Sequence, residues 1–232
     1  MSCALFSDTF DHGFHHYKQA LASNRRNLYL QNLLHKRPLF PHGHMYREAI
    51  LQGINSHALS RLHQGPDIRV LMACPPRWAT RRIAIVLGVA ALGMDALQSD
   101  GVHPTGGQRA GFRPLFMSVR QCDSPDALAD LIIASSCVPP LTPQSHKDGR
   151  VLFDGGLVSN VPIDGIEPGS GETLVLLTRR FRKLPTVPGR TYVQPSEPIP
   201  VAAWDYTHAR AVQQAFDLGR RDGESFCSTL DC

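Results

Sequence analysis

The segment RVLFDGGLVSNVPID, Arg150 to Asp164, decides how the rest of the chain is interpreted. Three apolar residues, 151–153, lead into a single carboxylate at Asp154, and two glycines follow it. The preceding pair Asp148-Gly149 is a strong signal for a hairpin turn, so residues 150–153 are expected to form a strand that ends at Asp154. The ends of strands are where α/β proteins commonly place functional groups.

Asp154 is open to several interpretations on local features alone. Gly155 and Gly156 carry no side chains, so another backbone or a substrate can approach the carboxylate closely. An aspartate in this position can orient a histidine, bind a metal ion, or accept a proton from a nucleophile. The alternative is that Asp-Gly-Gly forms only a turn, because Asp-Gly pairs are common in turns.

Short apolar runs bounded by turn residues alternate along the chain with segments of helical periodicity. The apolar runs predict buried strands at residues 68–73, 114–119, 151–153 and 173–177. The periodic segments predict helices at residues 14–34, 44–62, 124–136 and 203–223. Ser124 is suited to cap the third helix, with Pro125 at its first position. The alternation indicates an α/β architecture in which helices cover a sheet.

The composition is that of an ordinary folded protein. With 232 residues, of which 42% are hydrophobic, the chain can bury a sizeable core in a single domain, residues 1–232. The net charge of +4 is too small to indicate a nucleic-acid partner, and the basic residues are scattered except at 179–183. The proline-rich segment 184–200 is expected to be an extended loop before the last helix.

The cysteines and the apolar segments bear on location. Six cysteines lie far apart without a C-x-x-C pair, which favours a reducing cytosol over a disulfide framework. The first residues, MSCALFSDTFDHG, do not resemble a signal peptide. The run from Ile83 to Met94 is shorter than the roughly 20 residues that span a bilayer, so we expect a buried core helix. Because Trp78 and the arginines at 77, 81 and 82 lie beside it, peripheral membrane contact of a cytoplasmic protein is the alternative.

Histidine pairs raise the question of a metal site. His12 and His16 are one helical turn apart, a spacing that suits zinc, and His42 and His44 form a second pair. Neither an H-E-x-x-H motif nor a cysteine at metal-ligand spacing supports them. We therefore expect no metal and no cofactor.

Residues 134–162, ASSCVPPLTPQSHKDGRVLFDGGLVSNVP, closely resemble the C-terminal signature of patatin-like phospholipases. In that family a helix ends in A-S-S-x-x-P, a short hairpin follows, and the catalytic aspartate lies in D-G-G or D-G-A, with N-x-P downstream. The matching elements are Ala134-Ser135-Ser136, Pro139, Asp154-Gly155-Gly156 and Asn160-Val161-Pro162. Segments 24–34, 75–78 and 216–226 are also similar to bacterial members, so the resemblance covers essentially the entire chain.

The resemblance implies a three-layer α/β fold, with helices on both faces of a sheet, and a lipid or another acyl ester as substrate. It also implies hydrolysis by a Ser-Asp dyad without a cofactor, in which Asp154 is the base and Gly155 and Gly156 complete its motif. The family's serine lies in a G-x-S-x-G turn, and a glycine-rich loop binds the oxyanion. Because an aspartate with a pKa near 3.9 is a poor base at neutral pH, desolvation of Asp154 would give its buried setting a purpose.

No G-x-S-x-G motif occurs in the 232 residues. Pro168-Gly169-Ser170-Gly171 lacks the spacing, Ser2 has no flanking glycines, and Ser135 and Ser136 are expected to cap a helix end. Residues 3–14 resemble the end of the helix that follows the family's nucleophile. We therefore expect the serine and the first strands to precede Met1, with this chain as the C-terminal portion of the domain. The alternative is a non-catalytic relic, or a lipid- or membrane-binding module, that keeps the fold without turnover.

Overall fold

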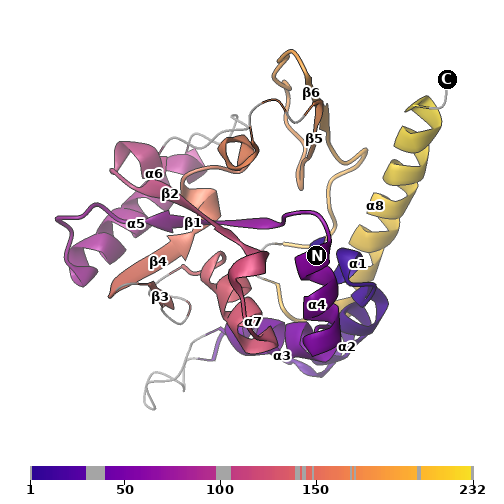
Figure 1. The fold of residues 1–232 in the computed structure, drawn as a ribbon, viewed down its shortest axis with the longest axis horizontal. Coiled ribbons are helices and arrows are strands. Elements are labelled where there is room, and N and C mark those ends of the chain that lie inside the picture. The colour runs from indigo at the N-terminus through magenta and orange to yellow at the C-terminus, as the bar shows by residue number, and fades with distance from the viewer. Residues whose placement is uncertain are drawn as a thin grey trace.

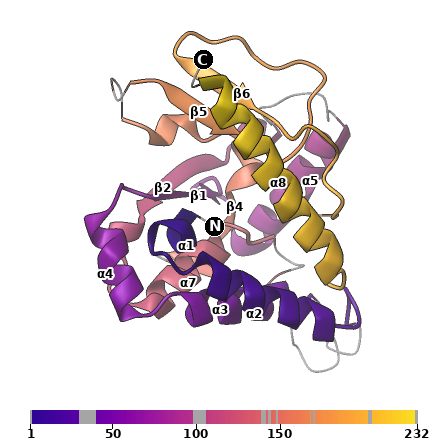
Figure 2. The ribbon, with the colours of Figure 1, turned by 90° about the vertical axis from the view of Figure 1, so that its right-hand side faces the viewer.

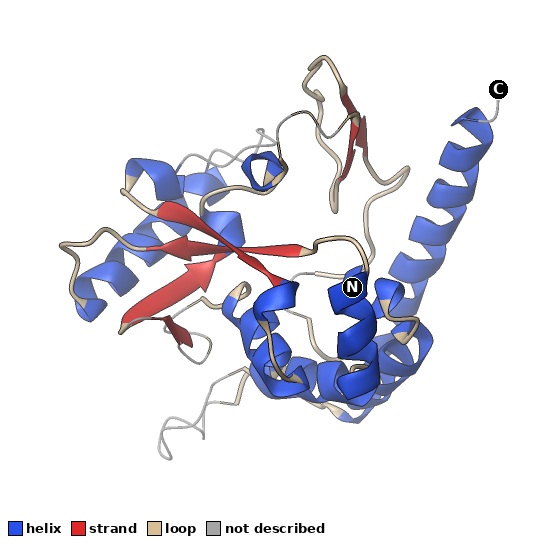
Figure 3. Ribbon diagram, in the orientation of Figure 1, coloured by secondary structure: helices blue, strands red, loops and turns tan. Residues whose placement is uncertain are grey.

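The structure is a computed structural model that describes residues 2–29, 40–97, 106–138, 142, 145–147, 149–167, 169, 171–202 and 205–230. A four-stranded sheet lies between two groups of helices, with a separate two-stranded sheet and a long C-terminal helix beside them (Figure 1; Figure 3). The predicted α/β class is confirmed.

The four-stranded sheet has the order β2-β1-β4-β3, and all neighbouring strands are antiparallel. Its strands are β1 (Arg69–Cys74), β2 (Arg113–Ser118), β3 (Ser145–Lys147) and β4 (Arg150–Asp154). β1 pairs with β2 along its whole length, but with β4 only at Met72 with Asp154 and Ala73 with Phe153. Asp154 therefore ends its own strand while lying beside the middle of β1.

The hairpin predicted at Asp148-Gly149 joins β3 to β4. Lys147 pairs with Arg150, which leaves a two-residue loop, and Gly149 has a φ of 74°. Two-residue hairpin loops need this left-handed conformation, which glycine adopts at little cost. Asp148 itself lies outside the described residues. All four strands predicted from the sequence are present, each displaced by no more than one residue at either end.

Helices cover one face of the sheet around Met72 and Leu152. They are α1 (Ser2–Phe6), α4 (Ser56–Gln64) and α7 (Pro125–Ala134), and α3 (His42–Gly53) packs against α7 and against α2 (Phe10–Ser23). The buried side chains that meet there include Cys3, Leu59, Leu62, Leu128 and Leu131. This is the larger of the two cores on the sheet.

The opposite face is covered by α5 (Arg81–Leu97) and α6 (Gly106–Arg109). In Figure 1 these two helices lie at the left, away from α4 and α7. Ala84 and Ala91 of α5 pack onto Val151 and Phe153 of β4. The expected arrangement of helices on both faces is confirmed.

The expectation that the apolar run of α5 is a buried core helix holds for only one face of the helix. Ile83, Val86 and Val89 are 41%, 67% and 50% exposed. The reason lies at Gly88, where an added Cβ would stand 2.7 Å from the ring of Phe153. Because the ring leaves so little room, the small residues of α5 lie closest to the sheet and Ile85 and Leu87 are partly buried beside them, whereas Ile83, Val86 and Val89 point outward.

The helix predicted at 44–62 is two helices. α3 ends at Gly53, and α4 begins at Ser56 with Asn55 as its cap. The side chain of Asn55 accepts a hydrogen bond from the N–H of Ala58 at 2.9 Å. Asparagine is among the best residues for this position, so it starts a new helix where the apolar periodicity alone showed no break.

Other helix boundaries differ from the prediction at one end or both. The first long helix, α2, begins at Phe10 and ends at Ser23, and residues 30–34 lie outside the described residues. The last helix is α8 (Ala209–Leu230), which begins after residue 203, also undescribed, and continues past Gly223. The predicted cap of α7 is confirmed, because Ser124 Oγ accepts the N–H of Ala127 at 3.2 Å.

The segment 184–200 is not wholly a loop, because it contains β6 (Arg190–Val193), which pairs in parallel with β5 (Thr173–Leu176). Thr173 donates its N–H to Gly189 at 2.9 Å, and Leu177 donates its N–H to Val193 at 2.8 Å. Since backbone groups alternate in direction along a strand, those of Leu174 and Leu176 point to the opposite, open edge of β5. The side chains of these two leucines are 51% and 71% exposed.

α8 runs as a long helix from α2 toward the β5–β6 pair (Figure 2). Its first half is held by Phe216, whose ring lies 5.4 Å from that of Phe10 and 5.0 Å from that of Phe14. Farther along, Asp222 accepts hydrogen bonds from the backbone N–H and the hydroxyl of Ser196, at 2.9 and 2.6 Å. These contacts join the C-terminal helix to α2 and to the segment that follows β6. The described residues also form three 3-10 turns: η2 (Val119–Gln121), η3 (Gly155–Leu157) and η4 (Ile163–Gly165).

Candidate active site

Asp154 lies at the junction of β4 and η3, and it is half-buried. Side chains alternate along a strand, so its carboxyl group projects from the same face of the sheet as Leu152. Oδ1 of Asp154 accepts a hydrogen bond from the N–H of Gly156 at 2.7 Å, which begins the 3-10 turn. The strand end thus holds the carboxylate in one orientation.

The two glycines of the motif have different roles. The sequence predicted that both leave room beside the carboxylate, but at Gly155 that space belongs to β1, because an added Cβ would overlap the carbonyl oxygen of Leu71. At Gly156 an added Cβ would lie 3.1 Å from Oδ1 of Asp154 and 3.5 Å from Oδ1 of Asn160. Gly156 therefore keeps the carboxylate accessible, and Gly155 allows the turn to pack on the sheet.

The helix end at 134–136 is bonded to the aspartate motif through the main chain. Asp154 donates its N–H to the carbonyl of Cys137 at 2.7 Å, and Gly155 donates its N–H to the carbonyl of Ser135 at 3.1 Å. The hydroxyls of Ser135 and Ser136 donate to the carbonyls of residues 132 and 133, at 2.7 and 3.2 Å. Their predicted capping role is confirmed, whereas Pro139 of the same motif lies outside the described residues.

Two groups that position the Asp154 motif were not predicted from the sequence. One is the carbonyl of Cys137, which no side-chain pattern could indicate because a main-chain atom makes the bond. The other is Gly107 of α6, where an added Cβ would overlap the carbonyl oxygen of Leu157 in η3. The pair Gly106-Gly107 was a visible signal for such a close approach.

Burial raises the pKa of the Asp154 carboxyl above its usual value of 3.8, while the hydrogen bond from the Gly156 N–H acts in the opposite direction. Desolvation disfavours the charged form of a carboxyl group, so Asp154 binds a proton more strongly than an exposed aspartate does. A carboxylate of this kind is a better general base near neutral pH.

The raised pKa of Asp154 predicts a stability effect. Above its folded-state pKa the buried carboxylate opposes folding, and this penalty disappears as the pH falls toward the unfolded value of 3.8. We expect Asp154→Asn to raise the free energy of unfolding at about pH 7 and the gain to shrink as the pH falls, because asparagine keeps the shape and accepts the Gly156 N–H. Urea unfolding at several pH values measures this.

Asp222 provides the matched control. Hydrogen bonds from Ser196 lower the pKa of its carboxyl, so Asp222→Asn is expected to reduce stability at neutral pH, the opposite sign. If Asp154→Asn also lowered the free energy of unfolding at neutral pH, the desolvation of Asp154 would be refuted.

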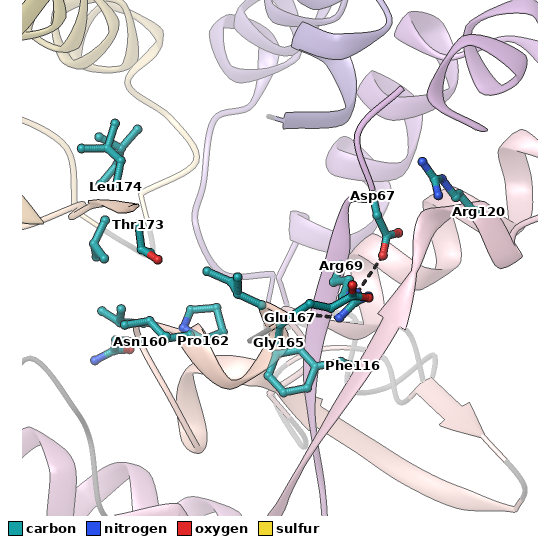
Figure 4. A pocket seen from close by; sticks show the side chains of 15 residues that line it. Asp67, Arg69, Phe116, Arg120, Asn160, Pro162, Gly165, Glu167, Thr173 and Leu174 are labelled. Carbon is teal, nitrogen blue, oxygen red and sulfur yellow. Dashed lines mark hydrogen bonds and ion pairs between the residues drawn. The ribbon is translucent and has the colours of Figure 1, made fainter. Parts of the chain in front are cut away.

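A cavity of about 620 Å³ lies between the N-x-P segment and β5 (Figure 4). Asn160 and Pro162 line it on one side, and Thr173 and Leu174 on the other. Arg69 also lines this cavity, but its charge is balanced by the carboxylates of Asp67 and Glu167, at 2.7 and 2.6 Å. The cavity therefore offers no free cation at Arg69 for an anionic ligand.

A second cavity, of about 960 Å³, is mainly apolar and lies among α1, α2, α3, α8 and the loops around residues 178–180, 198–202 and 205–206. Its aromatic and aliphatic lining includes Phe10, Phe14, Tyr17, Ile50, Ile54, Ile132 and Val212. Ile132 belongs to α7, one turn before Ser135, whose carbonyl holds Gly155. One helix thus connects the wall of this cavity to the aspartate motif.

The histidine and cysteine side chains of the described residues are the other candidate ligands of a metal ion. No three histidine, cysteine or carboxylate side chains of the described residues lie close enough together to hold a metal ion. His12 and His16 lie on α2 without a third ligand among these residues. The five cysteines in the described part of the chain form no disulfide with one another. No helix within the described ranges has the length and apolar character needed to cross a bilayer.

Comparison with models of protein families matches residues 2–166 to the family described as Patatin-like phospholipase. The match includes the helix end at 134–136, the Asp154 motif and the Asn160-Val161-Pro162 segment. Comparisons with curated proteins and with solved structures give no match. Since the matched residues make up well over half of the 232, the chain belongs to the patatin-like phospholipase family, a family of lipid acyl hydrolases.

Proposed function

We propose that Asp154 is the general base of a Ser-Asp dyad that hydrolyses lipid acyl esters. The observation that carries this proposal is a desolvated carboxylate whose Oδ1 is held by the Gly156 N–H. Among the described residues Oδ2 of Asp154 has no hydrogen-bond partner, so it is available to accept a proton. A base with a raised pKa and one free oxygen is what proton transfer from a serine hydroxyl requires.

The proposed reaction has two stages. In the first, the serine oxygen attacks the ester carbonyl carbon, Asp154 accepts the hydroxyl proton, and the alcohol leaves with that proton as the acyl-enzyme forms. In the second, water attacks the acyl-enzyme, Asp154 accepts a proton from that water and returns it to the serine oxygen, and the fatty acid is released. The serine and the carboxylate are both regenerated.

The apolar cavity beside α2 and α3 supports a lipid substrate. Its volume of about 960 Å³ and its aromatic and aliphatic lining suit an acyl chain. The wall residue Ile132 accepts the hydroxyl hydrogen bond of Ser135, whose carbonyl binds the N–H of Gly155. We therefore place the acyl chain in this cavity and the ester group near Asp154.

The nucleophile is proposed to lie in a segment that precedes residue 1. No serine hydroxyl within the described ranges is hydrogen-bonded to the Asp154 carboxylate, and the buried hydroxyl of Ser7 is engaged by the carbonyl of Cys3 at 2.8 Å and by Thr9 at 2.8 Å. The open edge of β5, with its two exposed leucines, is suited to receive a further strand. This open edge supports the proposal that additional residues add a strand to the β5–β6 sheet.

A serine-reactive fluorophosphonate probe tests the proposed nucleophile. We expect no labelling of the 232-residue chain, and labelling of a protein extended by the upstream reading frame if that frame encodes G-x-S-x-G. Replacing the serine of that motif with alanine is the control and should abolish labelling of the extended protein. Labelling of the 232-residue chain itself would refute the proposed position of the nucleophile.

A second candidate is a lipid-binding module without turnover. The observation that favours it is the lack of any G-x-S-x-G motif in the 232 residues, together with an apolar cavity large enough for an acyl chain. The two candidates differ in the upstream reading frame: a glycine-rich loop followed by G-x-S-x-G supports the enzyme, and its absence supports the module.

A further inference from the structure

The outward face of α5 is apolar where surface helices are usually polar. The small residues Ala84, Gly88 and Ala91 pack on the sheet, with Ile85 and Leu87 partly buried beside them. Ile83, Val86 and Val89, in contrast, face solvent. A solvated helix normally shows charged or polar residues on that face. No acidic residue occurs from 68 to 94, so the exposed stripe is not interrupted by a negative charge.

Trp78 extends this apolar stripe into the loop before α5. Its side chain is 69% exposed, the second largest exposure among the large apolar residues of the described chain. The loop is anchored behind it by Pro75 and Pro76, which are buried, and by the N–H of Ala79, which donates to the carbonyl of Pro76 at 3.0 Å. An exposed indole on an anchored loop suits the boundary between water and lipid.

Cationic side chains lie beside the stripe, and no acidic side chain within the described ranges is paired with them. Arg77, Arg81 and Arg150 line a small cavity of about 130 Å³ between the start of α5 and the β3–β4 hairpin, and no described carboxylate lines it with them. Arg82 is also exposed. None of these four arginines forms an ion pair with a described residue, whereas Arg47 and Arg69 are each paired with two carboxylates.

We propose that Trp78, Ile83, Val86 and Val89, together with these four arginines, form a docking surface for anionic lipid bilayers. The apolar side chains enter the interface between head groups and acyl chains, and the arginines bind the phosphate and carboxylate groups of the lipids. A second copy of the chain fits this face poorly, because a two-fold contact would bring the unpaired arginines of both copies together. The surface does not involve Asp154, so it stands apart from the proposed catalysis.

Vesicle binding tests the proposal on the 232-residue chain. We expect the chain to sediment with vesicles of phosphatidylcholine that contain about 30% phosphatidylserine, and much less with phosphatidylcholine alone or at high salt. The triple substitution Arg77→Glu, Arg81→Glu, Arg82→Glu should weaken binding to the anionic vesicles on the order of 100-fold, because each cation near such a membrane contributes several-fold in affinity. Val86→Asp should weaken it separately, since it places a charge in the apolar stripe.

A matched control reverses the same number of charges elsewhere. Arg210→Glu, Arg220→Glu, Arg221→Glu changes three exposed arginines of α8 and should leave most of the binding intact. Urea unfolding of each variant establishes that it is folded. Equal loss of binding in the α5 and α8 variants, failure of the folded chain to bind anionic vesicles, or a dimer in solution that Val86→Asp dissociates would overturn the proposal.

Discussion

Asp154→Asn is expected to reduce kcat/KM for acyl-ester hydrolysis about 1,000-fold or more in a protein that contains both the aspartate and the serine. Asparagine keeps the size of the side chain and the hydrogen bond from the Gly156 N–H, but it cannot accept a proton. The loss should appear in kcat with little change in KM, because the amide removes proton transfer and leaves substrate binding in place. Release of nitrophenol from a short-chain nitrophenyl ester measures both constants.

Asp164→Asn is the matched control for this loss. Asp164 lies in the same segment, is exposed and is not part of the Asp-Gly-Gly motif, so its amide variant should keep nearly full activity. Asp154→Asn is also expected to stabilise the fold at neutral pH, and urea unfolding at the pH of the assay establishes that the variant is folded. An Asp154→Asn enzyme that kept more than about a tenth of the activity would exclude Asp154 as the general base.

Gly155→Ala is expected to destabilise the fold by about 3 kcal/mol, the upper end of the usual cost of overpacking. The added methyl group would overlap the carbonyl oxygen of Leu71, and a backbone atom inside a sheet cannot move aside as a flexible side chain can. Gly107→Ala should have a comparable effect, because its methyl group would meet the carbonyl of Leu157. Gly155→Ala thus pushes η3, and with it Asp154, away from β1, and Gly107→Ala pushes η3 away from α6.

Gly223→Ala in α8 is the control for the glycine substitutions. A Cβ at Gly223 meets nothing within 4 Å, so alanine should stabilise the helix by roughly 0.5–1 kcal/mol through its better helix propensity. The midpoints of urea unfolding, compared at the same slope m, distinguish the expected destabilisation by Gly155→Ala from the expected stabilisation by Gly223→Ala. Equal midpoints for Gly155→Ala and the unmodified chain would show that the turn does not depend on its contact with β1.

Features of the fold that depend on neighbouring residues in the sequence were predictable. The Asp148-Gly149 hairpin, the strand before Asp154 and the Ser124 cap each follow from a few adjacent residues whose preferences agree with the structure. The interruption at Asn55 was also local, but a cap inside a periodic apolar pattern is easily read as part of one helix.

Features that depend on contacts between distant segments were not predictable. The exposure of Val86 follows from the ring of Phe153, more than sixty positions away, and the need for Gly155 follows from a carbonyl of β1. The candidate site shows the same division. Asp154 and its glycines could be identified from their motif, whereas the carbonyls of Ser135 and Cys137 that fix its backbone could not.

The main-chain bonds from residues 135 and 137 to Gly155 and Asp154 bear on how such a site can diverge between relatives. A carbonyl oxygen is present whatever side chain its residue carries, so substitutions at these positions preserve the bonds as long as the helix ends on the same path. Selection can then act on the course of the backbone and leave the side chains free to vary. The position of the carboxylate would then be conserved through the path of the backbone. It would persist in relatives whose side chains at residues 135 and 137 differ.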